Sequence, residues 1–173
     1  MEHSREWARQ IFQVVCLVDD LDAALDNWTN MVEFDESSLR RGRTESCFRG
    51  GEERPCLTRY ARFDLGGVEL RLVEPVDKAG DDPYSVCLRE KGPGFHHLGI
   101  YTEHPAELTA RYEEMGLHPA FREQVEGVNC AVYDFTEQIG LSLVLWDHMT
   151  GPCARLHEFN RKKEESSNES IGV

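Results

Sequence analysis

The sequence predicts an α+β fold built from two tandem β-α-β-β-β modules. The main observation is a repeat. Gln13 is followed 18 positions later by Met31, and His97 is followed 18 positions later by Met115. In both copies the first of these residues lies in an apolar, β-branched stretch and the second ends a segment with helical spacing. An internal repeat of this kind indicates two copies of one supersecondary unit that share a core.

The strands that close the two copies give a second observation. Each begins with a glycine and continues as an alternating strand-like run, at 67–71 in the first copy and 140–144 in the second. Aligning the copies makes Gln13 equivalent to His97 and Arg71 equivalent to Val144. We expect these four side chains to face a common centre between the modules.

The elements of the first module follow from local signals. The apolar run at 11–17 predicts a strand, and Asp19-Asp20 can cap a helix in which apolar residues recur at helical spacing. Gly66-Gly67 predicts a turn. Residues 33–57 are rich in Arg, Glu, Ser and Gly and are expected to hold one strand and a mobile loop. The expected elements are a strand at 11–17, a helix at 21–31, a strand within 33–57, and strands at 58–65 and 68–73.

The second module repeats this order after a polar join, in which residues 84–90 could form a short helix. Its expected elements are a strand at 95–101, a helix at 105–115, and strands at 121–126, 129–135 and 141–147. Gln13 and Arg71 lie 58 positions apart, but His97 and Val144 lie only 47 apart, which places an 11-residue insertion around 40–56. The expected segments are a lead-in at 1–10, module one at 11–76, a linker at 77–94, module two at 95–148 and a C-terminal extension at 149–173, disordered from about 161.

Composition excludes several classes of function. The formal net charge is −13, which argues against nucleic acids and anionic membrane surfaces because both need a basic footprint. Apolar runs are far shorter than a membrane span, and the N-terminus has no apolar signal region, so we expect a cytoplasmic protein. The six cysteines form no C-x-x-C pair and are expected to be free thiols. If one disulfide forms, Cys47 and Cys56 are the expected pair.

Two motifs carry a resemblance to a known family. Val68-Glu-Leu-Arg-Leu-Val-Glu-Pro75 and Gly92-Pro-Gly-Phe-His-His-Leu-Gly-Ile100 resemble the epimerase-like branch of the vicinal oxygen chelate superfamily. This superfamily includes glyoxalase I, methylmalonyl-CoA epimerase and extradiol dioxygenases. The resemblance implies that the modules form a cupped, open-barrel mixed sheet with helices outside, and that the protein is a homodimer. It also implies a divalent metal held by the first and last strands of each module.

The metal ligands of the family fall here on Gln13, Arg71, His97 and Val144. Only His97 is a usual ligand, since a guanidinium has no lone pair to offer and valine has no donor atom. We therefore expect a degenerate metal site and no cofactor. An alternative remains open, because Glu69 lies two residues before Arg71 and faces the same side of its strand. With a shift in register, Gln13, Glu69 and His97 could hold a divalent metal.

The resemblance implies an isomerase or lyase acting on a small acyl or carboxylate substrate. Arg71 and Gln13 would hold the polarised oxygen, and His97 or Glu69 would move the proton. Tyr133 is a candidate for substrate binding if it faces the barrel. Structural roles are the alternatives: a core histidine, an internal ion pair of Arg71, Gln13 bonded to Arg71 or His97, and a packing tyrosine. The alternative function is non-catalytic binding or sequestering of a small molecule on the same fold.

Overall fold

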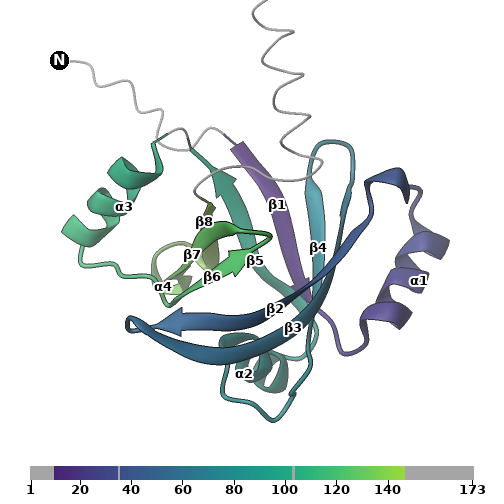
Figure 1. Ribbon diagram of the computed structural model, residues 1–173. Coiled ribbons are helices and arrows are strands. Elements are labelled where there is room, and N and C mark those ends of the chain that lie inside the picture. The colour runs from purple at the N-terminus through teal and green to yellow at the C-terminus, as the bar shows by residue number, and fades with distance from the viewer. Residues whose placement is uncertain (1–9, 35, 103, 147–173) are drawn as a thin grey trace, which may run out of the picture.

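A computed structural model of the chain describes residues 10–34, 36–102 and 104–146 (Figure 1). Residues 1–9 of the lead-in predicted at 1–10, and the whole of the predicted C-terminal extension, lie outside these residues. In chain order the elements are β1 (Gln10–Leu17), α1 (Leu21–Met31), the short 3-10 helix η1 (Glu36–Ser38), β2 (Arg40–Arg49), β3 (Glu52–Asp64), β4 (Glu69–Pro75), α2 (Pro83–Lys91), β5 (Gly94–Tyr101), α3 (Pro105–Glu114), β6 (Phe121–Val125), β7 (Val128–Phe135), α4 (Thr136–Ile139) and β8 (Leu141–Trp146).

The strands form one mixed barrel in the order β1-β4-β3-β2-β6-β7-β8-β5. Within each module the first strand pairs in parallel with the last, β1 with β4 and β5 with β8. The modules join along the antiparallel β1–β5 ladder. On the other side the sheet curls round until β2 meets β6 through only two residue pairs, at Cys47 and Phe48. The predicted two-module fold is confirmed. The short β2–β6 ladder, here called the seam, closes the cupped sheet into a barrel.

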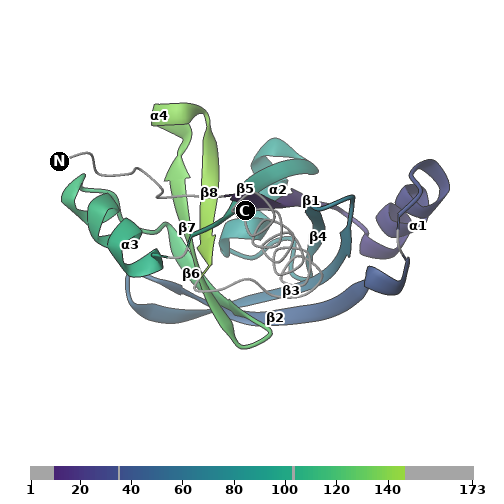
Figure 2. The ribbon, with the colours of Figure 1, turned by 90° about the horizontal axis from the view of Figure 1, so that it is seen from above.

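The helices cover the outside of the barrel, as expected. Figure 2 shows α1 and α3 on opposite sides of it. Asp20 caps α1 by accepting a hydrogen bond from the backbone N–H of Ala23. Leu21 and Leu25 of α1 pack on the outer face of β3 and β4, and Leu108 of α3 packs on the outer face of β7 and β8. A separate set of side chains therefore lines the inner face of the barrel.

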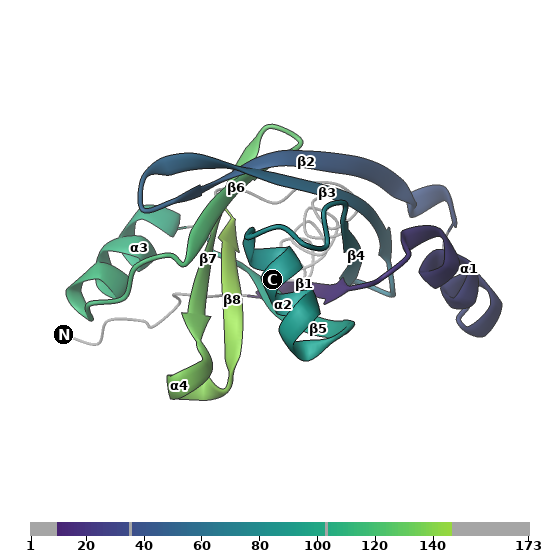
Figure 3. The ribbon, with the colours of Figure 1, turned by 90° about the horizontal axis from the view of Figure 1, so that it is seen from below.

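The linker helix α2 closes one end of the barrel. Seen from below, it lies in the middle of the view, surrounded by the barrel strands (Figure 3). Asp82 caps the helix through the backbone N–H groups of Tyr84 and Ser85. Tyr84 and Leu88 belong to the same buried cluster as Val15, Leu17 and other interior residues of the strands. The short helix expected at 84–90 thus forms part of the barrel core.

The segment expected to hold one strand and a mobile loop is a long hairpin instead. Strands β2 and β3 pair from Arg40–Arg62 to Arg49–Glu52, with one irregularity. Gly50 and Gly51 make the turn with positive φ angles. The described cysteines are free thiols, and Cys47 and Cys56 are both buried on this hairpin. None of the described helices is long and apolar enough to cross a membrane.

Candidate functional site

Polar side chains gather inside the barrel, on strands that belong to both modules. Gln13 on β1 lies opposite Glu69 on β4, while Val15 on β1 lies between Arg71 on β4 and His97 on β5. The four polar residues are fully buried. Alternation along a strand places i and i+2 on one face, so Glu69 and Arg71 both point inward. The predicted residues are thus brought together in two adjacent rows.

Gln13 and Glu69 are bonded directly. The Gln13 amide Nε2 donates to Glu69 Oε1 at 2.6 Å, and Arg62 Nη1 lies 3.6 Å from Glu69 Oε2. Gly99 passes close to this pair: a Cβ added there would lie 2.7 Å from the Gln13 Cβ. Gln13 was expected to bond Arg71 or His97, and that expectation was wrong. The register instead puts Glu69 beside it.

Arg71 is held by groups from three segments. Its Nη1 donates to Glu123 Oε1 on β6 at 3.0 Å, and the hydroxyl of Tyr84 on α2 donates to the same oxygen at 2.9 Å. The guanidinium carbon also lies 4.5 Å from the ring centre of Tyr60 on β3, which is a cation–π distance. Burial is the largest single effect on Arg71 and lowers its pKa, but Glu123, Tyr84 and Cys130 together outweigh it and the pKa is raised. The side chain is therefore a fixed, permanent cation.

His97 is neutral at ordinary pH. Burial lowers its pKa well below the usual value, and the neighbouring His96 and the Arg71 cation lower it further. Its Nδ1 lies 2.6 Å from Nδ1 of His96, so one ring donates and the other accepts. If His96 donates, the His97 Nε2 carries hydrogen. His97 can then act as a hydrogen-bond donor but is a weak base.

Glu69 has the opposite shift. Burial raises its pKa, and this effect outweighs the Arg62 and Arg71 cations and the Gln13 hydrogen bond. A carboxylate with a raised pKa is a stronger base than an exposed one. Among the predicted residues, Glu69 is therefore better suited than His97 to accept a proton.

Several buried atoms in this cluster make no hydrogen bond to the described residues. They include one acceptor on each of two side chains, two guanidinium N–H groups and one imidazole nitrogen: Gln13 Oε1, Glu69 Oε2, Arg71 Nε, Arg71 Nη2 and His97 Nε2. Buried polar groups are normally satisfied, and exceptions concentrate at functional sites. The set offers both donors and acceptors, which suits a small molecule that carries a carbonyl or carboxylate.

The donor set does not fit the divalent metal that the family resemblance implies. Val144 is buried inside the barrel and has no donor atom, and Arg71 is a cation. In the alternative set, Gln13 and Glu69 bond each other. Within the described ranges, no group of three His, Cys, Asp or Glu side chains is arranged to hold a metal ion. These residues favour a site without a divalent metal, which stays a prediction.

Tyr133 does not face the barrel interior, contrary to expectation. Its ring packs outward against Tyr112 of α3 and Phe135. Its neighbour Val132 belongs to the interior cluster. The alternative of a packing tyrosine agrees with this placement.

Sequence reasoning missed Glu123, Arg62 and Tyr84. Glu123 had a usable signal, because it alternates with Phe121 and Val125, and all three are buried on the inner face of β6. Arg62 likewise alternates with the buried Tyr60 on β3. A charged residue on the apolar, buried face of a strand predicts a buried partner that neutralises its charge.

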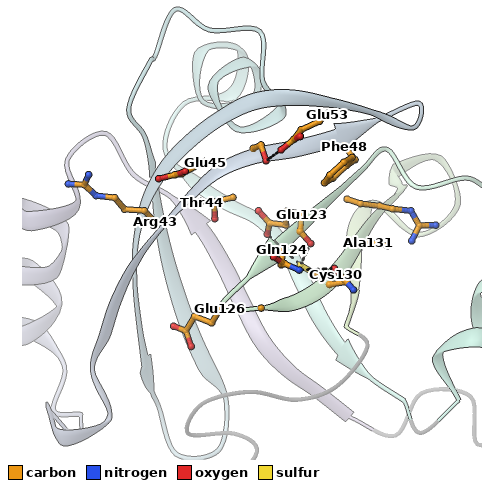
Figure 4. A pocket seen from close by; sticks show the side chains of 14 residues that line it. Arg43, Thr44, Glu45, Phe48, Glu53, Glu123, Gln124, Glu126, Cys130 and Ala131 are labelled. Carbon is orange, nitrogen blue, oxygen red and sulfur yellow. Dashed lines mark hydrogen bonds between the residues drawn. The ribbon is translucent and has the colours of Figure 1, made fainter.

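A pocket of about 760 Å³ opens at the β2–β6 seam, where the two strands diverge (Figure 4). We call it the seam pocket. Thr44 and Glu45 line it from β2, and Glu123 and Glu126 line it from β6 and the turn that follows. Thr44 and Glu123 are both buried. Since Glu123 also bonds Arg71, the pocket reaches the edge of the interior cluster.

Comparisons with known proteins agree with the geometry. The model of the glyoxalase/bleomycin resistance protein/dioxygenase superfamily matches residues 12–133. Methylmalonyl-CoA epimerase from Mycobacterium tuberculosis is 14% identical, with a TM-score of 0.62 over 85% of this chain and 93% of that one. A methylmalonyl-CoA epimerase in complex with methylmalonyl-CoA and NH4+ is 18% identical, with a TM-score of 0.56 over 84% and 99%.

A hypothetical protein from Bacillus halodurans C-125 is 15% identical, with a TM-score of 0.59 over 82% of this chain and 95% of that one. At such identities the solved structures support the fold alone. No curated protein sequence matches the chain. The family match, however, covers most of both modules and agrees with the expectation from the repeat and the two motifs. The chain therefore belongs to the glyoxalase/bleomycin resistance protein/dioxygenase superfamily.

Proposed function

We propose that this protein is an isomerase or lyase of the glyoxalase and epimerase type, which acts on a small acyl or carboxylate substrate without a divalent metal. The observation that carries the proposal is the buried cluster of Gln13, Glu69, Arg71 and His97, whose unbonded atoms include both donors and acceptors. Methylmalonyl-CoA epimerases among the structural neighbours support the reaction class by analogy only.

In the proposed reaction, Glu69 removes a proton from the carbon next to a carbonyl. The electron pair of that C–H bond moves to the carbonyl oxygen and forms an enolate. The free N–H groups of Arg71 donate to this oxygen, and His97 donates from Nε2 in the tautomer described above. Fixed donors in a dry site stabilise developing negative charge without reorganising. Delivery of a proton from solvent to the opposite face of that carbon completes an epimerisation, and Glu69 then releases its own proton to solvent.

The seam pocket supplies the route to the cluster in this proposal. Glu123 lines the pocket and holds Arg71, so a substrate oxygen that reaches Arg71 passes this carboxylate. We also propose a homodimer, which sedimentation equilibrium tests directly.

The experiment follows hydrogen exchange. Methylmalonyl-CoA and simple 2-substituted carboxylates are incubated with the protein in D2O, and loss of the α-proton signal is followed by NMR. Glu69→Gln should slow exchange by about 100-fold or more, since general base catalysis typically contributes that much. Tyr133→Phe, on the outer face, is the matched control and should exchange normally. Equal exchange in wild type and Glu69→Gln would contradict the mechanism.

One observation favours binding without turnover as the second candidate. Arg71 already has an ionic partner in Glu123, and both side chains are buried. A ligand that is retained by the protein and released unchanged, with no deuterium uptake after long incubation, would select this function. Proton exchange that depends on Glu69 would select the first.

A further inference from the structure

The proposed base is closed off from solvent. Gln13, Glu69 and Arg71 are fully buried, so a substrate reaches them only if part of the barrel opens. A row of charged side chains leads outward from Glu69: Arg62 Nη1 lies 3.6 Å from Glu69 Oε2, and Arg62 Nη2 bonds the carboxylate of Glu126. The side chains of Glu69 and Arg62 are at most 2% exposed, whereas that of Glu126 is 41% exposed. Glu126 is thus the outermost member of a row that ends on the proposed base.

Glu126 has an unusual backbone conformation. It forms the two-residue turn between β6 and β7 together with Gly127, and the φ angles are 50° for Glu126 and 81° for Gly127. Among the described residues, Glu126 is the only one other than glycine with a positive φ. Turns with two positive φ angles favour Asn-Gly, Asp-Gly or Gly-Gly, and a long side chain is sterically unfavourable there. A glutamate at this position indicates that its carboxylate does something that a better turn former would not.

The carboxylate of Glu126 connects this turn to the first module. It bonds Arg62 and accepts a hydrogen bond from the hydroxyl of Tyr60 at 3.3 Å, and both partners lie on β3. The ladder between β2 and β6 is confined to Cys47 and Phe48 and their partners, so it does not extend to the turn. The turn also lines the seam pocket, and Figure 4 shows Glu126 projecting from it. Side-chain contacts, rather than backbone pairing to β2, therefore hold the turn against the first module.

We infer that Glu126 is a latch on the entrance to the interior cluster, meaning a side chain whose bonds keep that entrance shut. When its carboxylate leaves Arg62 and Tyr60, the β6–β7 turn moves away from β3, and the seam pocket opens onto the row that leads to Glu69. The inference deepens the proposed function and rests on it, because the latch matters to a substrate that must reach Glu69. The opening itself can be measured without a substrate.

The test is labelling of buried thiols by N-ethylmaleimide in the native full chain, followed by mass spectrometry of the cysteine-containing peptides. Cys130 is 2% exposed and lines the seam pocket, so it reports opening of the turn. Cys56 is 1% exposed and donates to Asp82 beside α2 at 3.6 Å, away from the seam pocket, so it reports general loosening. Glu126→Gln should speed Cys130 labelling by about 5-fold or more, since a hydrogen bond between charged groups is lost at a partly exposed site. Cys56 labelling should not change.

Two further variants separate the carboxylate from the turn. Glu126→Asn also removes the latch but places a favoured residue at the first turn position, so it should speed Cys130 labelling as well. Glu52→Gln removes an exposed glutamate that pairs with Arg54 on the β2–β3 hairpin, and it should change neither thiol. Unchanged Cys130 labelling in Glu126→Gln, or an equal rise at Cys56, would overturn the latch. Faster Cys130 labelling in Glu126→Gln, together with no α-proton exchange by wild type, would support the opening and refute the proposed reaction instead.

Discussion

The Tyr84 hydroxyl allows a sharp test of the buried network, because the chain contains its own control. Tyr84 is fully buried and donates to Glu123 Oε1 at 2.9 Å. Tyr133 is equally buried, at 1% exposed, but its hydroxyl makes no hydrogen bond to the residues described. Tyr→Phe removes the same atom at both positions. A hydrogen bond to a charged group contributes about 1.5–3 kcal/mol, whereas an unbonded buried hydroxyl contributes nothing.

We therefore expect Tyr84→Phe to lower the free energy of unfolding by about 1.5–3 kcal/mol, and Tyr133→Phe to leave it unchanged or raise it slightly. For a chain of this length the Tyr84→Phe loss corresponds to a fall of roughly 3–12 °C in Tm. Urea denaturation followed by circular dichroism measures both. Equal losses in the two variants would refute the reasoning, since the effect would then come from the ring packing.

Three further predictions concern the interior residues. Gly99→Ala should lower the free energy of unfolding by about 1–3 kcal/mol, measured by urea denaturation, because its Cβ would lie 2.7 Å from that of Gln13. The pKa of His96 is lowered to about 4, chiefly by burial, and that of His97 is also lowered, so the unfolded chain binds more protons below pH 6.5. Stability should then fall from pH 6.5 towards pH 4, and His96→Gln should flatten this slope in denaturation curves. Glu69 has a raised pKa, so its contribution to stability is lost as pH rises above about 4.5. Glu69→Gln should therefore gain stability relative to wild type with rising pH, which a series of urea titrations measures.

The fold was predictable because the sequence contains the unit twice. A repeated element is therefore indicated by two separate segments of the chain. The hairpin of β2 and β3 was missed for a physical reason. Along β2 only Thr44 and Cys47 are buried, and the remaining positions are largely charged and exposed. A strand at the edge of a module needs few apolar residues, so its sequence is similar to that of a loop.

The site residues were predictable only where a polar side chain interrupts an otherwise apolar strand. Gln13 and Arg71 interrupt apolar strands, and polar residues at such positions stand out. Strand β7 gave no such contrast, because Val132 packs inside the barrel while Tyr133 packs outside against α3. When both faces are buried, alternation does not tell which one points inward. Glu123 lies on β6, outside the two motifs that carry the resemblance, so the resemblance did not draw attention to it.

Two ion pairs, one of them fully buried, connect the modules near the short β2–β6 ladder. Arg71 of the first module pairs with Glu123 of the second, and Arg62 of the first pairs with Glu126 of the second. Both pairs cross near the seam, where β2 and β6 share only two residue pairs. A buried ion pair adds little net stability, but loss of one partner leaves a costly charge. The pairs therefore penalise any displacement of β6 that would separate them. Pairs of opposite charge thus connect the two halves directly.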